Sequence, residues 1–365
     1  MILVTGGAGF IGSNFIRSWF VGSNEQILNF DSLTYAGDLE RISGLDNNLH
    51  KFVRGNILDR PLLVKLLFEY QPRAIIHFAA ESHVDRSILG PEAFLETNVF
   101  GTFRLLDAAK EYWSSLDKNK RIEFRFIHIS TDEVYGTLNS EDEPFSENSP
   151  YSPNSPYAAS KASSDHFVRS FYQTYNFPSI ITNCSNNYGP YQHPEKLIPL
   201  MILKALSGQY MPIYGDGSQI RDWLHVSDHC SAIKNILEKG TIGETYCIGG
   251  DNENQNIIIV KNICSILDEL VPLSSNEFCR RKMIHKGLEG NRYSELINYV
   301  KDRPGHDTRY AINFTKLSND LGWKPNISFS DGLRATIKWY LNNKKWLNRD
   351  SDPEFQAWLS KQYGN

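Results

Sequence analysis

A tyrosine and a lysine four residues apart, Tyr157 and Lys161, have the spacing of a proton-transfer pair. Residues at i and i+4 lie on the same face of a helix, so the two side chains would be neighbours. A lysine ammonium beside a phenol stabilises the phenolate, which lowers the pKa of the tyrosine from about 10 towards the working pH. Such a tyrosine can accept a proton from a hydroxyl group while a hydride leaves the same carbon. A surface pair with this spacing is common, so the interpretation depends on its setting.

Two adjacent carboxylates, Asp132 and Glu133, follow an expected strand at Phe124–Ser130, with Thr131 between. Ligands of open α/β sheets bind at the carboxyl ends of the strands. The two carboxylates could cap the next element, or they could act as an acid and a base if their environments separate their pKa values. Oxidation of a hydroxyl needs only the tyrosine and the lysine. An added acid/base pair therefore indicates a second step, such as removal of a proton next to a carbonyl followed by loss of water.

A glycine-rich segment containing Gly6, Gly7, Gly9 and Gly12 follows the first expected strand and begins the first expected helix. This spacing lets the backbone turn tightly and approach a pyrophosphate at the helix N-terminus. Asp31 ends the second expected strand 19 residues after Gly12, where an acidic group accepts hydrogen bonds from the adenosine ribose. An aspartate would repel a 2′-phosphate, so the pattern favours NAD over NADP. A glycine-rich turn without a ligand is the alternative.

The elements that would position these residues alternate in the first half of the chain. Short apolar runs and helical patterns follow one another, which predicts βαβ units, a doubly wound parallel sheet and an α/β fold. We expect strands at Ile2–Thr5, Ile27–Asp31, Lys51–Arg54, Ala74–Phe78, Phe124–Ser130 and Ser179–Cys184. We expect helices that begin near Gly9 and at Asp59, and helices over about Pro91–Trp113 and Pro156–Tyr175.

The pattern loosens after residue 184. Residues 186–199 are expected to form a turn-rich loop, and residues 139–155 and 274–295 are expected to form surface loops. The expected helices of this half are Ser227–Lys239, Val260–Leu270, Ser330–Asn343 and Asp352–Tyr363.

Composition excludes several classes of protein. The 365 residues carry 38 basic and 42 acidic side chains, so no basic field is available for nucleic acid or a membrane surface. Five scattered cysteines form no CxxC pair, which argues against disulfides and a metal site. No apolar stretch reaches about 18 residues, and no leader pattern begins the chain. We therefore expect a soluble globular protein of the cytoplasm, and composition says nothing about its chemistry.

Longer blocks along the chain resemble the extended short-chain dehydrogenase/reductase family, and within it the nucleotide-sugar 4,6-dehydratases. The blocks are TGGAGFIGSN (5–14), DSLTYAGDLE (31–40), HFAAESHVDRSI (77–88), ETNVFGT (96–102), ISTDEVYG (129–136), SPYAASKASSDH (155–166), TNCSNNYGPYQHPEKLIP (182–199), PIYGDGSQIRDWLHVSDH (212–229) and DRPGHDTRYAI (302–312). Epimerases and decarboxylases of the family share the glycine loop and the Tyr/Lys pair. They typically lack the Asp-Glu pair and the NNYGPYQHPEKLIP block.

The resemblance implies a redox-neutral dehydration of dTDP-glucose with NAD retained on the protein. Tyr157, aided by Lys161 and Thr131, would take the proton of the 4-hydroxyl as hydride moves from carbon 4 to NAD. Glu133 would remove the proton on carbon 5, and Asp132 would protonate the departing 6-hydroxyl. The hydride would then return to carbon 6 and give dTDP-4-keto-6-deoxyglucose, the precursor of rhamnose or another deoxysugar. The site must exclude solvent during these steps.

The resemblance also assigns binding residues. For NAD it assigns Gly6, Gly9, Phe10, Ile11, Gly12, Asp31, Ser32, Leu33, Thr34, Asn56, Ile57, Phe78, Ala79, Ala80, Ser82, Thr97, Tyr157, Lys161 and Asn187. For the nucleotide sugar it assigns Ser82, Thr131, Asn186, Lys196, Leu197, Pro212, Ile213, Tyr214, Arg221, Asn256, Arg303 and His306. Without the family, His306 would be read as a turn or core histidine, and Arg221 as a partner of Asp222. No metal is expected.

Three positions depart from the family pattern. Asn56 stands where an aspartate is usual, which replaces one charged contact to the adenosine by an amide. Ser32 replaces a common lysine after Asp31, and residues 274–295 are longer than usual. These departures concern retention of NAD and the nucleotide end of the site.

The domains follow from the motifs and the resemblance. Residues 1–185 are expected to form an NAD-binding domain to which the chain returns at about 213–248, and residues 186–212 and 249–365 a smaller α/β nucleotide-sugar lobe. Family members are homodimers, and a helical face within 91–113 or 156–175 could supply the interface. Two alternatives stay open. One is a UDP-sugar 4,6-dehydratase or 4-epimerase of the same family, and the other is an NAD-binding regulator without catalysis.

Overall fold

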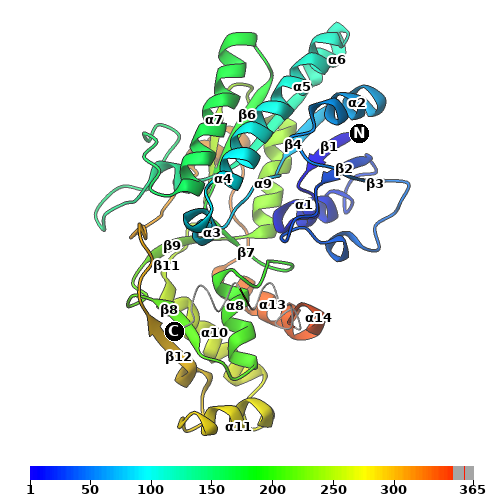
Figure 1. Ribbon diagram of the computed structural model, residues 1–365. Helices are drawn as coiled ribbons and strands as arrows, with labels where there is room; N and C mark the ends of the chain where they lie inside the picture. The colour runs from blue at the N-terminus through cyan, green and yellow to red at the C-terminus, as the bar shows by residue number, and fades with distance from the viewer. Residues whose placement is uncertain (348–356, 358–365) are drawn as a thin grey trace.

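A seven-stranded parallel sheet is the centre of the computed structural model, which describes residues 1–347 and residue 357 (Figure 1). The strands follow the order β10-β6-β5-β4-β1-β2-β3, and every neighbouring pair is parallel. Their bounds are β1 (Ile2–Thr5), β2 (Ile27–Asp31), β3 (His50–Arg54), β4 (Ala74–His77), β5 (Arg125–Thr131), β6 (Ser179–Cys184) and β10 (Thr245–Ile248). The predicted α/β class and doubly wound sheet are confirmed.

Continuous apolar runs form these strands because helices cover both faces of the sheet. Ile2 and Val4 of β1 belong to one buried cluster and Leu3 to another. Successive side chains of a strand point to opposite faces, so both faces need apolar residues. The helices of one face are α1 (Phe10–Trp19), α9 (Val226–Lys239) and α12 (Thr315–Leu321), and those of the other are α2 (Arg60–Tyr70), α5 (Thr102–Ser115) and α7 (Pro156–Tyr175).

Local capping signals place the starts of two helices. The Asp59 side chain accepts a hydrogen bond from the Leu62 amide (3.1 Å) at the start of α2, as the sequence predicts. The Ser155 hydroxyl accepts one from the Ala158 amide (3.1 Å) at the start of α7. Tyr157 therefore lies in the first turn of α7, close to the edge of the sheet.

The helix expected over Pro91–Trp113 is interrupted. It consists of α4 (Glu92–Phe94), a π-helical segment at Leu95–Gly101 and α5. Two short helices, α3 (Val84–Leu89) and α6 (Lys118–Glu123), precede α4 and follow α5. In the π-helical segment Asn98 bonds both the amide and the carbonyl of Glu81 (2.9 and 3.0 Å), which ties it to the loop after β4. Such π turns recur at functional sites.

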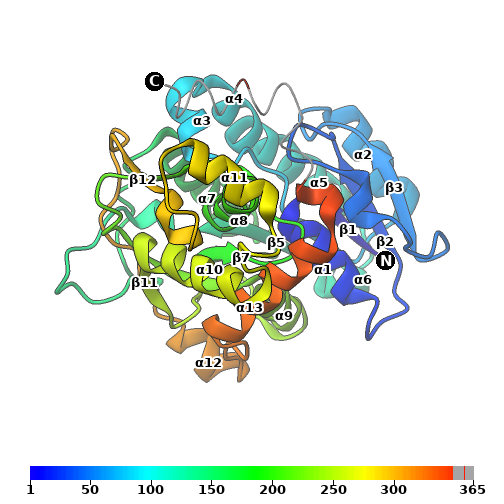
Figure 2. The ribbon, with the colours of Figure 1, turned by 90° about the horizontal axis from the view of Figure 1, so that it is seen from below.

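A second lobe follows β6 in the chain. One small sheet contains β7 (Asn186–Tyr188), β9 (Ile220–His225) and β11 (Glu253–Gln255), and another contains β8 (Met211–Tyr214) and β12 (Ile297–Val300). The helices α8 (Leu197–Leu206), α10 (Asn256–Leu270), α11 (Glu277–His285) and α13 (Phe329–Asn342) surround a separate apolar core (Figure 2). The short helix α14 (Lys344–Leu347) follows α13. The sequence predicted that the chain returns to the NAD-binding domain at about 213–248. In this range β10 is a strand of the large sheet and α9 packs on its face, whereas β9 lies in a small sheet of the second lobe.

Two expected loops contain regular structure. Residues 274–295 include α11, whose Cys279 and Met283 are buried one turn apart and whose start is capped by Asn276 (3.3 Å to the Cys279 amide). The many charged residues of α11 make this apolar stripe difficult to recognise in the sequence. Residues 186–199 include β7 and the beginning of α8, where turn residues surround short elements. The helix expected at Asp352–Tyr363 lies outside the described residues, apart from residue 357.

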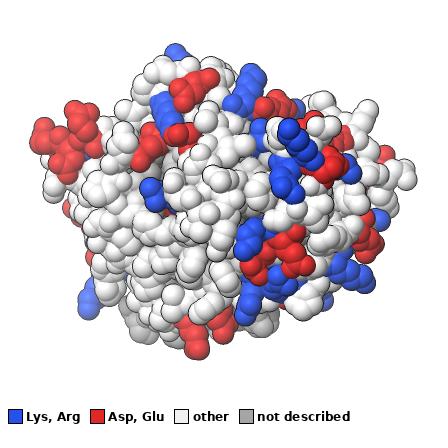
Figure 3. Space-filling model, turned by 90° about the horizontal axis from the view of Figure 1, so that it is seen from above, with Lys and Arg blue, Asp and Glu red and all other residues white. Residues whose placement is uncertain are grey.

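Surface charge, apolar helices and metal-ligating side chains can be described for residues 1–347 and 357. Figure 3 shows acidic and basic side chains interspersed on the face it presents, without a continuous basic patch. No helix in that part of the chain is long and apolar enough to cross a membrane. Residues 1–347 and 357 contain no group of three His, Cys, Asp or Glu side chains arranged to hold a metal ion.

Candidate active site

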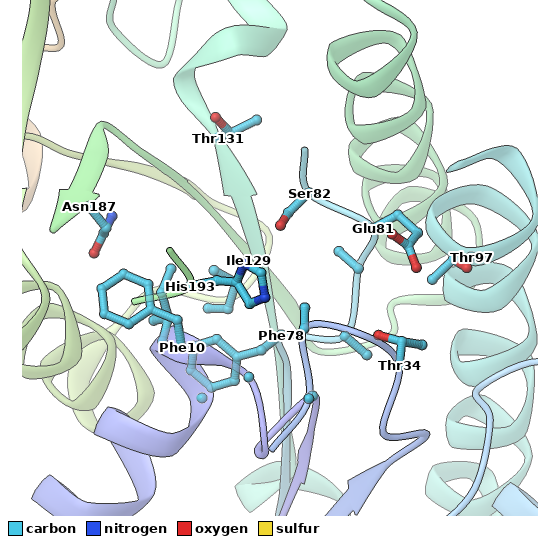
Figure 4. Close-up of a pocket in the computed structure, with 18 of the residues that line it drawn as sticks. Phe10, Thr34, Phe78, Glu81, Ser82, Thr97, Ile129, Thr131, Asn187 and His193 are labelled. Atoms are coloured by element: carbon cyan, nitrogen blue, oxygen red, sulfur yellow. The ribbon is translucent and has the colours of Figure 1, made fainter. Parts of the chain in front are cut away.

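A cavity of about 300 Å³ opens at the carboxyl edge of the large sheet. The loops after β1 and β4 meet there, and these neighbouring strands lead the chain to opposite sides of the sheet. Figure 4 shows Phe10 and Asn187 on one side and Glu81 and Thr97 on the other, with Thr131 at the end of β5. The residues that line this cavity therefore come from segments spread between positions 6 and 196 of the chain.

Most of the predicted site residues line this cavity. They are Gly6, Gly9, Phe10, Ile11, Gly12, Asp31, Ser32, Thr34, Asn56, Ile57, Phe78, Ala79, Ala80, Ser82, Thr97, Thr131, Asp132, Glu133, Tyr157, Lys161, Asn186, Asn187 and Lys196. The remaining predicted residues lie outside its lining: Leu33, Leu197, Pro212, Ile213, Tyr214, Arg221, Asn256, Arg303 and His306.

The glycine loop brings backbone atoms into close contact. Gly6 has φ +72°, and a Cβ there would lie 2.6 Å from the Ala79 nitrogen. A Cβ at Gly12 would lie 2.4 Å from the Gly6 carbonyl oxygen. Helix α1 begins after Gly9 without a side-chain cap, so its first amide groups are free to bind an anion at the positive end of the helix. This cradle fits a pyrophosphate.

Asp31 is positioned by the same loop. One carboxylate oxygen accepts a hydrogen bond from the Ala8 amide (2.9 Å) and the other from the Leu33 amide (2.8 Å). Burial raises the pKa of Asp31, and these two bonds oppose the shift. Each oxygen can accept a further bond, so the carboxylate fits the hydroxyls of a ribose. Asn56 uses its side-chain oxygen to accept from the Leu58 amide (2.9 Å), which stabilises the turn after β3.

The Tyr157 and Lys161 side chains are buried together, but their electrostatics differ from the expectation. Lys161 Nζ donates to the Ile129 carbonyl oxygen (2.8 Å), and burial lowers the pKa of Lys161 to about 8, opposed by the charge of Asp165. Burial also raises the pKa of Tyr157 well above 10, with a smaller lowering from a hydrogen bond to Thr131. The expected fall of the tyrosine pKa is wrong for this structure, because desolvation of the phenolate outweighs the contributions that lower it.

Asp132 and Glu133 have different surroundings. Burial raises the pKa of Asp132 well above its usual range, and the charges of Glu133 and Asp222 raise it further. Burial also raises the pKa of Glu133, but the positive charges of Arg303, Lys196 and Arg221 oppose the shift. The environments therefore favour a protonated Asp132 beside a more readily ionised Glu133.

Three predicted nucleotide-sugar residues outside the cavity lining, Tyr214, Arg303 and His306, make side-chain contacts with carboxylates. Arg303 pairs with Asp85 of α3 (2.8 Å), and the Tyr214 hydroxyl donates to the same carboxylate (3.2 Å). His306 Nδ1 lies 2.6 Å from Asp302, and burial lowers the pKa of this histidine to about 4. Arg303 and Tyr214 are therefore held against the first domain.

Arg221 does not pair with its neighbour Asp222. Its guanidinium donates to the Asp307 carbonyl oxygen (2.9 Å) and stands 4.3 Å from the centre of the Tyr310 ring. Asp222 instead accepts from the amides of Gly250 and Asn252, both at 2.8 Å. The charge of Arg221 is thus available to an anion near Glu133.

Several cavity residues were not predicted. They are Phe30, Ala36, Gly37, Arg41, Gly55, Glu81, Ile129, Ser130, Cys184, Ser185, Gln192, His193 and Glu195. Glu195 is buried and bonds Arg86 (3.1 Å) and the Tyr35 hydroxyl (3.3 Å), so it joins the loops after β2, β4 and β7. His193 and Glu195 belong to the 182–199 block, which was the signal that could have identified them.

Arg41 is a second unpredicted residue of this kind. It is fully buried and donates to the carbonyl oxygens of Ala8 (3.0 Å), Ala36 and Tyr191 (3.0 Å). These bonds link the glycine loop to segments of both domains. No local sequence pattern distinguishes this arginine from a surface one.

Comparisons with known proteins agree over nearly the whole chain. The family model described as GDP-mannose 4,6 dehydratase matches residues 3–336. The chain is 50% identical to dTDP-glucose 4,6-dehydratase 1 of Escherichia coli (strain K12) over 371 residues, covering 99% of this chain and 98% of the relative.

Solved structures give the same result. A dTDP-glucose 4,6-dehydratase of Streptomyces venezuelae with NAD bound superposes with a TM-score of 0.82 at 43% identity, covering 94% of this chain and 98% of that one. The UDP-glucose 4-epimerase of Thermotoga maritima reaches a TM-score of 0.79 at 26% identity, covering 94% and 99%.

Proposed function

The chain belongs to the extended short-chain dehydrogenase/reductase family of NAD-dependent epimerases and dehydratases, and we propose that it converts dTDP-glucose to dTDP-4-keto-6-deoxyglucose. The observation that carries this proposal is the placement of Asp132 and Glu133 in one cavity with Tyr157, Lys161 and the glycine loop. A hydroxyl oxidation alone does not need the two carboxylates. Their presence beside the Tyr/Lys pair supports an elimination of water in the same site.

The residues present fit NAD as a resident cofactor. The glycine loop and the start of α1 would hold the pyrophosphate, and Asp31 would hold the adenosine ribose. When bound, NAD would supply reversible hydride transfer, with the hydride coming from carbon 4 of the sugar and returning to carbon 6. Tyr157 would accept the proton of the 4-hydroxyl, with Thr131 as its hydrogen-bond partner and the Lys161 ammonium close behind.

The two carboxyl groups would then each carry out one proton transfer of the elimination. Oxidation at carbon 4 acidifies the proton on carbon 5, and Glu133 would remove it, because Arg303, Lys196 and Arg221 favour its ionised form. Asp132 would protonate the departing 6-hydroxyl, because burial and neighbouring negative charges raise its pKa and favour its protonated form. These opposite influences on the two pKa values support the acid role of Asp132 and the base role of Glu133.

Cations around the second lobe would bind the diphosphate. Lys196 lines the cavity and donates to the Ser82 carbonyl oxygen (2.9 Å), while Arg221 and Arg303 lie close enough to shift the pKa of Glu133. Charge-assisted hydrogen bonds from arginines suit such a group. We propose an NAD domain formed by residues 1–185 with α9, β10 and α12, which belong to the large sheet and its covering helices, and a nucleotide-sugar lobe formed by the remaining described residues.

A homodimer is proposed from an apolar surface on the first domain. Leu95, Phe100 and Phe167 are 51%, 57% and 38% exposed, and the rings of Phe103 and Phe167 lie 5.8 Å apart where α5 and α7 pack (Figure 1). A large exposed apolar patch favours association. Sedimentation of the wild type as a dimer, and of Phe100→Asp as a monomer, would support this interface. A wild-type monomer would exclude it.

The experiment that tests the activity uses purified protein and dTDP-glucose without added NAD. We expect a 4-keto product, detected by its absorbance in alkali. UDP-glucose is the matched control: turnover of UDP-glucose with dTDP-glucose inert would replace this proposal by a UDP-sugar enzyme. Glu133→Gln should block exchange of the carbon 5 proton with solvent while hydride transfer survives, and normal exchange in this variant would remove Glu133 as the base. The cytoplasmic location stays a prediction.

A further inference from the structure

Asp165 lies one helical turn beyond Lys161 on α7 and has no part in the mechanism above. Tyr157, Lys161 and Asp165 are four residues apart in succession, so they share one face of the helix. All three are buried, and Asp165 is only 1% exposed. A buried carboxylate needs partners, because an isolated charge away from water is costly.

One oxygen of this carboxylate collects three donors from different parts of the fold. Asp165 Oδ2 accepts from the hydroxyls of Ser130 and Tyr151 (both 2.9 Å) and from the Asn183 side-chain amide (3.1 Å). The Asn183 amide also lies 3.1 Å from the Thr131 carbonyl oxygen. Asp165 therefore joins α7 to the end of β5, directly beside the Thr131-Asp132-Glu133 segment, and to β6.

We infer that Asp165 is a positioning residue for the dehydration: its carboxylate fixes the end of β5 against α7 and supplies the negative charge that keeps Lys161 an ammonium. The inference rests on the proposed function, because it assigns Asp165 a part in that reaction. In this role Asp165 differs from a purely structural anchor, because turnover needs the negative charge of its carboxylate and not only its hydrogen bonds.

The groups that face Lys161 support this requirement for charge. His77 on β4 and His128 on β5 are buried, and burial lowers the pKa of each, to about 4 for His128, so both are neutral near pH 7. Burial raises the pKa of the Cys184 thiol on β6 far above its usual range, so this group is also neutral. Tyr157, on the same helix, would carry charge only as the phenolate that accepts the substrate proton, and burial raises its pKa. Among the groups named here, Asp165 is therefore the one whose negative charge raises the pKa of Lys161.

An asparagine at position 165 separates the charge from the hydrogen bonds. Its carbonyl oxygen can take the place of Oδ2 and accept from Ser130, Tyr151 and Asn183. Its amide then takes the place of Oδ1, which lies 3.1 Å from His128 Nε2, and can donate to this nitrogen in the neutral tautomer that carries its proton on Nδ1. Asp165→Asn thus preserves the shape of the network and removes its charge. Tyr151→Phe is the matched control, because it removes one donor and leaves the charge in place.

The test measures kcat for dTDP-glucose against pH with NAD-loaded wild type, D165N and Y151F. The alkaline fall of kcat in D165N should move to lower pH by about one unit or more, since Asp165 and Lys161 are neighbours at i and i+4 on one helix and a nearby opposite charge shifts a pKa by about 1–3 units. In Y151F it should stay in place or move slightly upwards, because the carboxylate loses a partner that disperses its charge. Wild-type turnover tests the proposed function separately.

Three outcomes would overturn the inference. One is a D165N profile that falls equally at every pH, which would make Asp165 a structural anchor. Another is a downward shift of equal size in Y151F, which would assign the effect to the hydrogen bonds. The third is failure of both D165N and a second neutral variant, D165S, to fold with bound NAD, because the carboxylate would then serve folding and not tuning.

Discussion

Replacing Gly6 by alanine should destabilise the fold and weaken the binding of NAD. Gly6 has φ +72°, where a residue with a Cβ loses about 1–2 kcal/mol. The added carbon would lie 2.6 and 2.7 Å from the nitrogen and Cα of Ala79 and 2.8 Å from the carbonyl carbon of Phe78. All three are backbone atoms, so the loop must shift, at an overpacking cost of about 1–3 kcal/mol. We expect a total loss of about 2–5 kcal/mol in the free energy of unfolding.

Gly44 provides a matched control for this substitution. It has nearly the same backbone conformation (φ +74°), but a Cβ there would meet no atom within 4 Å. Gly44→Ala should therefore lose only the conformational part, about 1–2 kcal/mol. The difference between the two variants measures the close approach of the glycine loop to the segment after β4.

Urea titrations with and without NAD, together with the dissociation constant of NAD, measure these effects. Gly6 lines the cavity, so the contact cost of about 1–3 kcal/mol corresponds to about 5- to 150-fold weaker NAD binding in Gly6→Ala. Gly44→Ala should leave this constant nearly unchanged. Equal destabilisation of the two variants, or unchanged NAD binding in Gly6→Ala, would refute the steric reasoning.

Three further predictions concern the site. Turnover should fall as pH rises through about 8, because Lys161, with a pKa of about 8, must stay protonated to stabilise the Tyr157 phenolate; a kcat profile that is flat to pH 10 would contradict this. Arg303→Met should raise KM for dTDP-glucose about tenfold or more with a smaller change in kcat, since a charge-assisted hydrogen bond contributes about 1.5–3 kcal/mol; steady-state kinetics would show an unchanged KM if Arg303 does not bind substrate. Glu195→Gln should release NAD during gel filtration, because Glu195 joins the loops after β2, β4 and β7 around the cavity. Full NAD content in that variant would rule out this role.

Features set by neighbours along the chain could be predicted from the sequence. The apolar runs marked the strands of the large sheet, except β10, because each strand is covered on both faces. Asp59 marked the start of α2, because a cap bonds an amide three residues away. The glycine loop and the 129–136 and 155–166 blocks marked the cavity, since each is a contiguous segment at the edge of the sheet.

Other elements lacked such a signal. Helix α11 was missed because its buried stripe is short and its other positions are charged. Strand β7 and the start of α8 were missed because turn residues surround them, and β7 depends on pairing with β9 more than 30 residues later. Tertiary pairing, and not local preference, decides such short elements.

The sequence by itself determined which groups this protein has for its chemistry: a phenol and an ammonium one turn apart, two adjacent carboxylates and a phosphate-binding glycine loop. Only the tertiary structure decided their protonation states. Burial raised the pKa of Tyr157 and lowered that of Lys161, opposite to the shift that their pairing alone suggested for the tyrosine. Folding also brought together two residues that are 218 positions apart, so that an Arg303 guanidinium nitrogen lies 2.8 Å from a carboxylate oxygen of Asp85. Desolvation and Coulomb energies depend on distances through space, and these exist only once the chain has folded.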